Sequence, residues 1–101
     1  MSLPSAGDLK SVAFEQEGNS GNYWDPEWIA SFLSGLRQGK NTGKKSVSDS
    51  PSGVSSVKVT LHFSGGGSSV LFVYEKNGRF FAEQPYAGIW EISKETYGKL
   101  S

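Results

Sequence analysis

One histidine and ten acidic residues are the side chains of this 101-residue chain that suit acid–base or metal chemistry. General acid–base and nucleophilic catalysis usually draw on His, Cys or paired carboxylates. His62 points outward on a predicted strand, and Glu15 and Glu17 are expected at a solvated strand edge. Neither His62 nor any carboxylate has a partner at the helix or loop spacing of metal ligands. The sequence therefore predicts no catalytic residue, no metal site, no cofactor and no enzymatic activity.

Residues 39–46 read Gly-Lys-Asn-Thr-Gly-Lys-Lys-Ser and superficially resemble a phosphate-binding loop. The glycines are too close together, Lys45 stands where Ser or Thr should follow Lys44, and a helix rather than a strand precedes the segment. Arg37 and Lys40 nevertheless join Lys44 and Lys45 in concentrating positive charge near the end of that helix. Two interpretations remain: a solvated loop, or a surface that contacts anionic lipid or wall polymer.

Aromatic side chains cluster around the start of the same helix. Tyr23, Trp24 and Trp28 have the chemistry of a sugar-stacking platform, and Tyr86 offers a second one. However, Trp24 precedes the helix cap and is expected to pack on Ile29 as a hydrophobic staple. Trp28 lies one turn before Phe32. Packing in the core is therefore the favoured interpretation of this cluster.

Overall composition excludes several classes of protein. Ten basic and ten acidic residues give a formal net charge of zero, without the basic excess of a nucleic-acid binder. The absence of cysteine excludes disulfides and thiolate chemistry. No apolar run is long enough for a transmembrane segment. Residues 1–8 are expected to be a leader or disordered, and an original secretion signal or lipid anchor is expected upstream of Met1.

The elements that must position these residues follow from periodicity and turn chemistry. Residues 9–16 suit a strand that ends in a flexible Gly18–Asn22 stretch. Asp25 as N-cap, Pro26 at the first helical position and Gly39 as C-cap delimit a helix. Its apolar face carries Ile29, Phe32, Leu33 and Leu36. The Lys40–Ser56 segment, rich in Gly, Ser and Lys, is predicted to be a long flexible loop.

The C-terminal half predicts a four-strand antiparallel meander followed by a helical turn that Ser93 caps. Strands are expected from Val57 to Ser64, Ser69 to Glu75, Arg79 to Gln84 and Ile89 to Ile92, with Asn77-Gly78 as a type I′ turn. The predicted fold class is α+β. One main helix packs on one face of a mostly antiparallel sheet, in the order strand, helix, four-strand meander, within one domain over residues 1–101.

Turn lengths also predict the strand register. A two-residue Asn77-Gly78 loop places Tyr74 opposite Phe81, and four-residue loops elsewhere place Phe63 opposite Val70 and Glu83 opposite Trp90. One sheet face is then nearly pure apolar and meets the helix. The second face gathers an apolar patch with a polar rim, which we interpret as a surface for a second copy or a protein partner, or as one covered by the chain itself. The patch comprises Leu71, Val73, Phe80, Ala82 and Ile89.

Glu83 is unusual in this register because its carboxylate turns toward the helix, opposite Trp90 and near Phe72. An unpaired charge there is costly. Three explanations stay open: escape at the sheet edge, pairing with Arg37 or another cation, or membership of a functional site.

The segment from Tyr74 to Trp90, Tyr-Glu-Lys-Asn-Gly-Arg-Phe-Phe-Ala-Glu-Gln-Pro-Tyr-Ala-Gly-Ile-Trp, resembles the C-terminal signature of a family of small Firmicute proteins of unknown function. Lys45-Ser46-Val47, with Asp49 and Pro51, is similar to the middle segment of that family. Members are often secreted or lipid-anchored, so the resemblance implies an extracytoplasmic location. It implies no activity and no functional residue.

The predicted function is a non-enzymatic cell-envelope binding or accessory module in peripheral contact with membrane or cell wall. The alternative is a small protein inhibitor or immunity-type protein-binding domain. Salt-sensitive binding to anionic envelope material favours the first, and a tight stoichiometric protein complex favours the second.

Overall fold

Helix α1 (Pro26–Arg37) begins where the sequence predicts. The Asp25 carboxylate accepts a hydrogen bond from the Glu27 backbone N–H at 3.1 Å, and Pro26 occupies the first turn. The helix ends with Gln38 rather than Gly39 as its C-cap. Its four predicted core residues are all buried: Ile29, Phe32, Leu33 and Leu36. The predicted staple is wrong, because Trp24 is 65% exposed.

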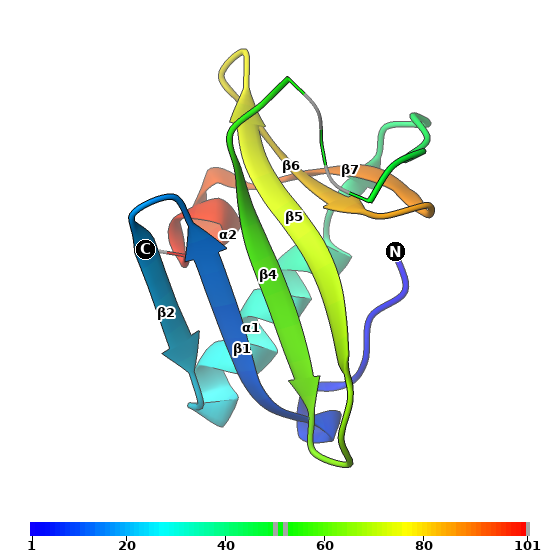
Figure 1. Ribbon diagram of the computed structural model, residues 1–101. Helices are drawn as coiled ribbons and strands as arrows, with labels where there is room; N and C mark the ends of the chain where they lie inside the picture. The colour runs from blue at the N-terminus through cyan, green and yellow to red at the C-terminus, as the bar shows by residue number, and fades with distance from the viewer. Residues whose placement is uncertain (50, 52, 101) are drawn as a thin grey trace.

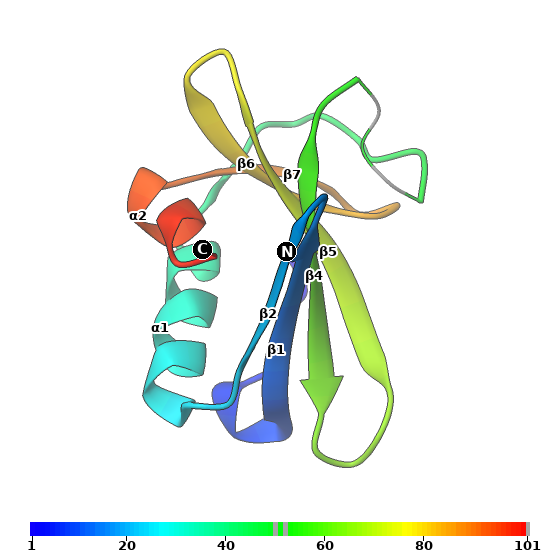
Figure 2. The ribbon, with the colours of Figure 1, turned by 60° about the vertical axis from the view of Figure 1, so that its left-hand side comes forward.

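A seven-stranded, wholly antiparallel sheet packs against this helix in the order β2-β1-β4-β5-β6-β7-β3. The strands are β1 (Leu9–Gln16), β2 (Asn19–Tyr23), β3 (Lys40–Asn41), β4 (Ser56–Phe63), β5 (Ser68–Lys76), β6 (Arg79–Gln84) and β7 (Gly88–Ile92). Figure 1 shows α1 behind β1 and β4. Figure 2 shows that β6 and β7 run across the direction of β1 and β4, so the sheet is strongly twisted.

The predicted α+β class, with one main helix on an antiparallel sheet, is confirmed. Two edge strands were not predicted. β2 lies in the stretch that the sequence marks as flexible, and β3 lies at the start of the predicted Lys40–Ser56 loop. Both are polar and largely exposed, so they lack the apolar alternation that identifies a strand.

Two of the three predicted registers are wrong. Tyr74 does lie opposite Phe81, and Asn77 and Gly78 both have positive φ as a type I′ turn requires. Val70, however, lies opposite Thr60, three residues from the predicted Phe63. The Gly65–Ser68 run marks a turn without fixing where it begins, and β5 already starts at Ser68.

The β6–β7 register is shifted by one residue, so Glu83 lies opposite Ile89 rather than Trp90. The connecting turn is shorter than predicted: the Ala87 N–H bonds to the Gln84 carbonyl at 3.0 Å, and Tyr86 has a φ of 62°. This matches a type II turn with a tyrosine at the position that normally favours glycine. Because both shifts are odd, β5 and β6 turn opposite faces to the helix from those predicted.

The core lies between α1 and the sheet face that carries Val59, Leu71, Val73 and Ala82. Residues 1–8, predicted to be a leader or disordered, contact this core. Met1, Leu3 and Ala6 pack against it, Ala6 within a short 3-10 turn, η1 (Ala6–Asp8). The Ser2 N–H donates to Gln84 Oε1 at 3.1 Å, and Gln84 Nε2 donates to the Ser2 carbonyl at 2.7 Å.

A short second helix, α2 (Lys94–Gly98), closes one end of the core, and Ser93 caps it as predicted by accepting from the Thr96 N–H at 3.1 Å. The computed structural model describes residues 1–49, 51 and 53–100. Residues 50 and 52 of the predicted loop and residue 101 of the predicted domain lie outside the described residues.

Candidate functional site

The described residues of segment 42–55, which are 42–49, 51 and 53–55, lie on the side of the sheet away from α1, over β5, β6 and β7 (Figure 2). We call this side the outer face. Thr42 fixes the segment at one end, since its N–H and its hydroxyl both donate to the Ile89 carbonyl, at 3.0 and 2.8 Å. At Asp49 the carboxylate accepts a hydrogen bond from the Tyr86 hydroxyl at 2.7 Å. The described part of the predicted flexible loop is therefore anchored to the sheet.

Glu83 lies beneath this segment, on the outer face of β6, and is only 6% exposed. The Ser46 hydroxyl donates to its Oε2 at 2.8 Å, and the Tyr74 hydroxyl donates to its Oε1 at 3.1 Å. Burial, followed by the charge and the hydrogen bond of Glu83, raises the pKa of Tyr74 to about 12. Tyr74 thus stays protonated as a donor to a carboxylate.

Three adjoining hollows, with volumes of about 190, 340 and 70 Å³, extend from this pair, and the first is lined by both Tyr74 and Glu83. Lys76 lines all three, and neighbouring hollows share Lys44, Tyr74, Phe81 or Ile89. Lys45 lines the hollow that contains Glu83, and Arg79 lines the one of about 340 Å³. We call the three together the basic groove. It has an aromatic and aliphatic floor with a rim of four cationic residues: Lys44, Lys45, Lys76 and Arg79.

Only two of the four predicted anion-contact residues lie in this groove. Lys44 and Lys45 line it, whereas the Arg37 guanidinium donates to the Pro4 carbonyl. Lys40 lies opposite Glu91 at the β3 edge. The pairing of Glu83 with Arg37, one of the explanations that the sequence leaves open, is therefore wrong.

Lys76 and Arg79 were missed by the sequence analysis. They lie directly opposite one another across the Asn77-Gly78 turn, which places both long side chains on the same face. That turn was predicted correctly, so the sequence alone could have placed Lys76 opposite Arg79. What the sequence could not supply was the position of segment 42–55, which brings Lys44 next to them.

The predicted partner-binding patch is not a surface. Leu71, Val73 and Ala82 are 1%, 0% and 1% exposed and belong to the core beneath α1. Phe80 packs partly against that core and lies 4.8 Å from Tyr97, measured between ring centroids. Ile89 lies on the opposite, outer face and lines the basic groove. The register error described above accounts for this difference.

The aromatic cluster at the helix start is mainly core, as the sequence analysis favours. Tyr23 and Trp28 stack with centroids 3.7 Å apart, and Phe14 and Phe32 extend the stack at either end. The Tyr23 hydroxyl donates to the Lys99 carbonyl at 3.0 Å. Of the three predicted platform residues, Trp24 is strongly exposed, whereas Tyr23 and Trp28 are partly buried against the core.

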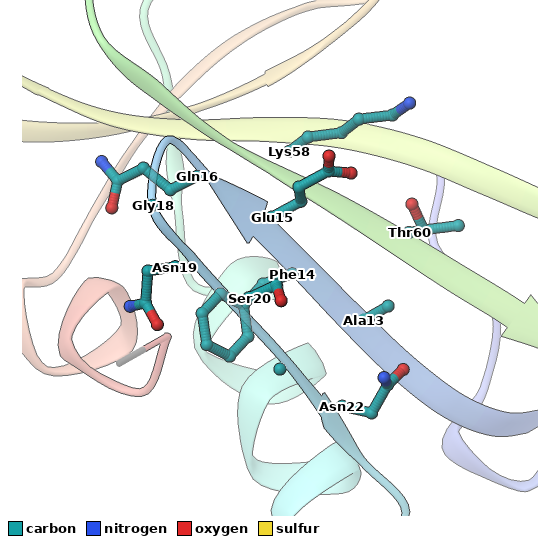
Figure 3. A pocket seen from close by; sticks show the side chains of 11 residues that line it. Ala13, Phe14, Glu15, Gln16, Gly18, Asn19, Ser20, Asn22, Lys58 and Thr60 are labelled. Carbon is teal, nitrogen blue, oxygen red and sulfur yellow. The ribbon is translucent and has the colours of Figure 1, made fainter.

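A separate hollow of about 550 Å³ lies over β1, β2 and β4 (Figure 3). Ala13 leaves room at its floor, and Glu15 and Lys58 lie opposite one another across the β1–β4 pair. Its other lining residues are mostly small or carry amides and hydroxyls, so it is a wide, polar trough. Unlike the basic groove, it contains no buried charged side chain.

Within the described part of the chain, no three His, Cys, Asp or Glu side chains lie close enough together to hold a metal ion. His62, the single histidine, lies on β4 opposite Ser11 and Ser68. Over the same residues, neither helix has the length and apolar character needed to cross a membrane.

Comparison with known proteins identifies the family. A family model, DUF5301, described as "Domain of unknown function (DUF5300)", matches residues 1–91. The chain belongs to the DUF5301 family. The DUF5301 chain is also similar to a solved protein, titled "NMR structure of the protein from Ruminococcus gnavus", with 32% identity and a TM-score of 0.78. The match covers 95% of this chain and 97% of that one. No curated protein matches this DUF5301 chain.

Proposed function

We propose that this DUF5301 protein is a non-enzymatic binding module of the cell envelope that contacts phosphate-bearing envelope material through the basic groove. One observation carries the proposal. Lys44 and Lys45 from segment 42–55 meet Lys76 and Arg79 from the β5–β6 hairpin around one hollowed surface, although the chain has a formal net charge of zero. Such a local excess of positive charge attracts anions regardless of net charge.

The magnitude of this attraction suits a peripheral contact. A lysine or arginine close to an anionic surface contributes about 1 kcal/mol, and the contribution falls within a Debye length. Arg79 is partly neutralised by Glu91, whose carboxylate lies 3.9 Å from its guanidinium. Lys44, Lys45 and Lys76 are therefore the main contributors. An extracytoplasmic location, secreted or lipid-anchored, is part of the proposal and follows from the family resemblance.

Binding to anionic vesicles, neutral vesicles and a soluble glycerol-phosphate polymer tests the proposal. We expect binding to anionic material that weakens as salt is raised, and at least about a tenfold loss of affinity in a Lys44→Ala/Lys45→Ala double variant. A Lys10→Ala/Lys94→Ala variant is the control, because it loses the same charge outside the groove. Comparison of vesicle and polymer separates lipid headgroups from wall polymers.

Equal losses in the two double variants would contradict a groove-specific contact and would leave only general charge attraction. Recovery of a tight stoichiometric protein complex, with no binding to anionic material, would instead support the inhibitor-type alternative.

A further inference from the structure

Glu83 is a buried carboxylate without a direct counterion. Its two hydrogen bonds come from uncharged hydroxyls, those of Ser46 and Tyr74. Among the described residues it forms no ion pair, and the one salt bridge found there joins Arg79 to Glu91 on the exposed surface. Removing a carboxylate from water is costly unless a charge or several hydrogen bonds compensate it.

Attachment of segment 42–55 does not require this charge. The Ser46 hydroxyl of the segment needs only one acceptor at Glu83, and a glutamine carbonyl of the same length would accept from it at much lower desolvation cost. The glutamine NH2 would in turn donate to the Tyr74 hydroxyl oxygen. The charge is therefore better explained by something that the carboxylate attracts. Each of its oxygens accepts one described hydrogen bond and keeps a second lone pair.

The hollow that Glu83 lines carries both negative and positive side chains. It has a volume of about 190 Å³, below that of pockets that enclose drug-sized ligands, so it suits a small polar group. Val47, Val54 and Ile89 supply apolar walls, and Lys45 and Lys76 supply cations. A ligand with one positive charge alone would be repelled by the lysines, and a simple anion would be repelled by Glu83.

We propose that this hollow binds a small zwitterionic group, with an ammonium against Glu83 and a phosphate against Lys45 and Lys76. This inference rests on the proposed function, since it names the chemistry of the phosphate-bearing group that the basic groove takes. An ammonium supplies the missing counterion of Glu83 and donates to its free lone pairs. The two lysines meanwhile bind the phosphate as point charges.

Aminoethyl phosphate and hydroxyethyl phosphate are suitable probes, because they have nearly the same size and differ in the ammonium group. Titration of each into the protein, followed by backbone amide shifts, should show that the wild type prefers aminoethyl phosphate by about fivefold or more. Glu83→Gln should lose that preference and should bind hydroxyethyl phosphate more tightly than the wild type does, since a repulsive charge is gone.

Glu75→Gln is the matched control, because it removes the same charge at an exposed position of β5 that lines none of the three groove hollows. It should retain the preference for the ammonium-bearing probe. Vesicles with aminoethyl phosphate headgroups, compared with the soluble probe, distinguish a lipid source from a free or polymer-borne one.

Equal affinity of the wild type for the two probes, or no detectable binding of either, would overturn the inference. So would a preference that survives in Glu83→Gln or that disappears equally in Glu75→Gln. These outcomes leave the proposed function intact if the wild type still binds anionic vesicles or polymer and Lys44→Ala/Lys45→Ala does not.

Discussion

Tyr74 and Glu83 form the most unusual pair of side chains in the molecule, because a phenol and a carboxylate share a covered site. The Tyr74 hydroxyl remains a donor only while it is protonated. Loss of its proton would place a second negative charge 3.1 Å from Glu83 Oε1. The pKa of Tyr74 is accordingly raised from 10.0 to about 12, first by burial and then by Glu83.

This shift predicts a loss of stability in alkaline solution. Between pH 10 and 12 the unfolded chain releases the Tyr74 proton and the folded chain keeps it, so the free energy of unfolding falls as pH rises through this window. Below pH 10 the contribution is fully present. We expect Tyr74→Phe to show a smaller fall than the wild type, measured by denaturant unfolding at the two ends of the window.

Tyr86→Phe is the comparison for this experiment. Tyr86 also has a raised pKa, because its hydroxyl donates to Asp49, but it lies on the exposed surface where water screens the interaction. Its substitution should change the pH dependence less than Tyr74→Phe does. The reverse order would contradict the role assigned to burial and Glu83.

Sequence reasoning singled out Glu83 as an unusual polar residue, but the orientation that it assigned was wrong. The predicted register turned it toward the helix, opposite Trp90, whereas it lies on the outer face opposite Ile89. A single acidic residue in a largely apolar strand can be recognised from the sequence whatever the strand register is. Its partners, Ser46 and Tyr74, depend on how a segment without periodicity crosses the sheet, and no local pattern encodes that.

Helix α1 and the β5–β6 hairpin are the elements that local chemistry determines best. The cap at Asp25 and the two positive φ angles at Asn77 and Gly78 are consequences of residue type alone. Strand β2 is the opposite case. It is polar and contains Gly21, whose lack of a Cβ leaves room for the Phe14 ring across the β1–β2 pair. Its strand conformation therefore comes from pairing with β1.

Helices α1 and α2 pack closely against each other at Gly35. An added Cβ at this position in α1 would collide with Thr96 Oγ1 and lie 2.9 Å from Thr96 Cγ2. Gly→Ala normally stabilises a helix interior by about 1 kcal/mol. Here we expect Gly35→Ala to destabilise the protein by about 1–3 kcal/mol in denaturant unfolding, because overpacking outweighs propensity.

Removal of the colliding side chain should restore the normal effect. In a Thr96→Ala background, Gly35→Ala should be neutral or stabilising, which a double-mutant cycle measures directly. Ser31→Ala, at an exposed position one turn earlier in α1, is the control for propensity. A stabilising Gly35→Ala in the wild-type background would show that α1 and α2 are farther apart than described.

At the scale of the whole molecule, the register of β5 decides which residues form the core. The apolar residues of β5 occur at both parities, so periodicity alone does not choose a face. Turn length was the remaining guide. The predicted register was wrong by three residues at the β4–β5 turn and by one residue at the β6–β7 turn, so the wrong faces of β5 and β6 were assigned to the helix. The layers and the helix position were predictable, whereas the complete sheet was needed to decide that Val73 faces the helix and Tyr74 faces outward.

Neighbouring residues Val70 and Leu71 give the sharpest test of this assignment. Leu71 is 1% exposed beneath α1, whereas Val70 lies half-buried on the outer face. We expect Leu71→Ala to lower the free energy of unfolding by about 2–5 kcal/mol, since it leaves a cavity in the core. Val70→Ala should cost less than about 1 kcal/mol, because water can fill the space. The predicted register would require the reverse order.

Unfolding curves give the energies, and mass in solution shows whether either variant changes the association state. A larger loss at Val70 than at Leu71 would return β5 to the register that the turn lengths suggested, and with it the apolar patch to the surface.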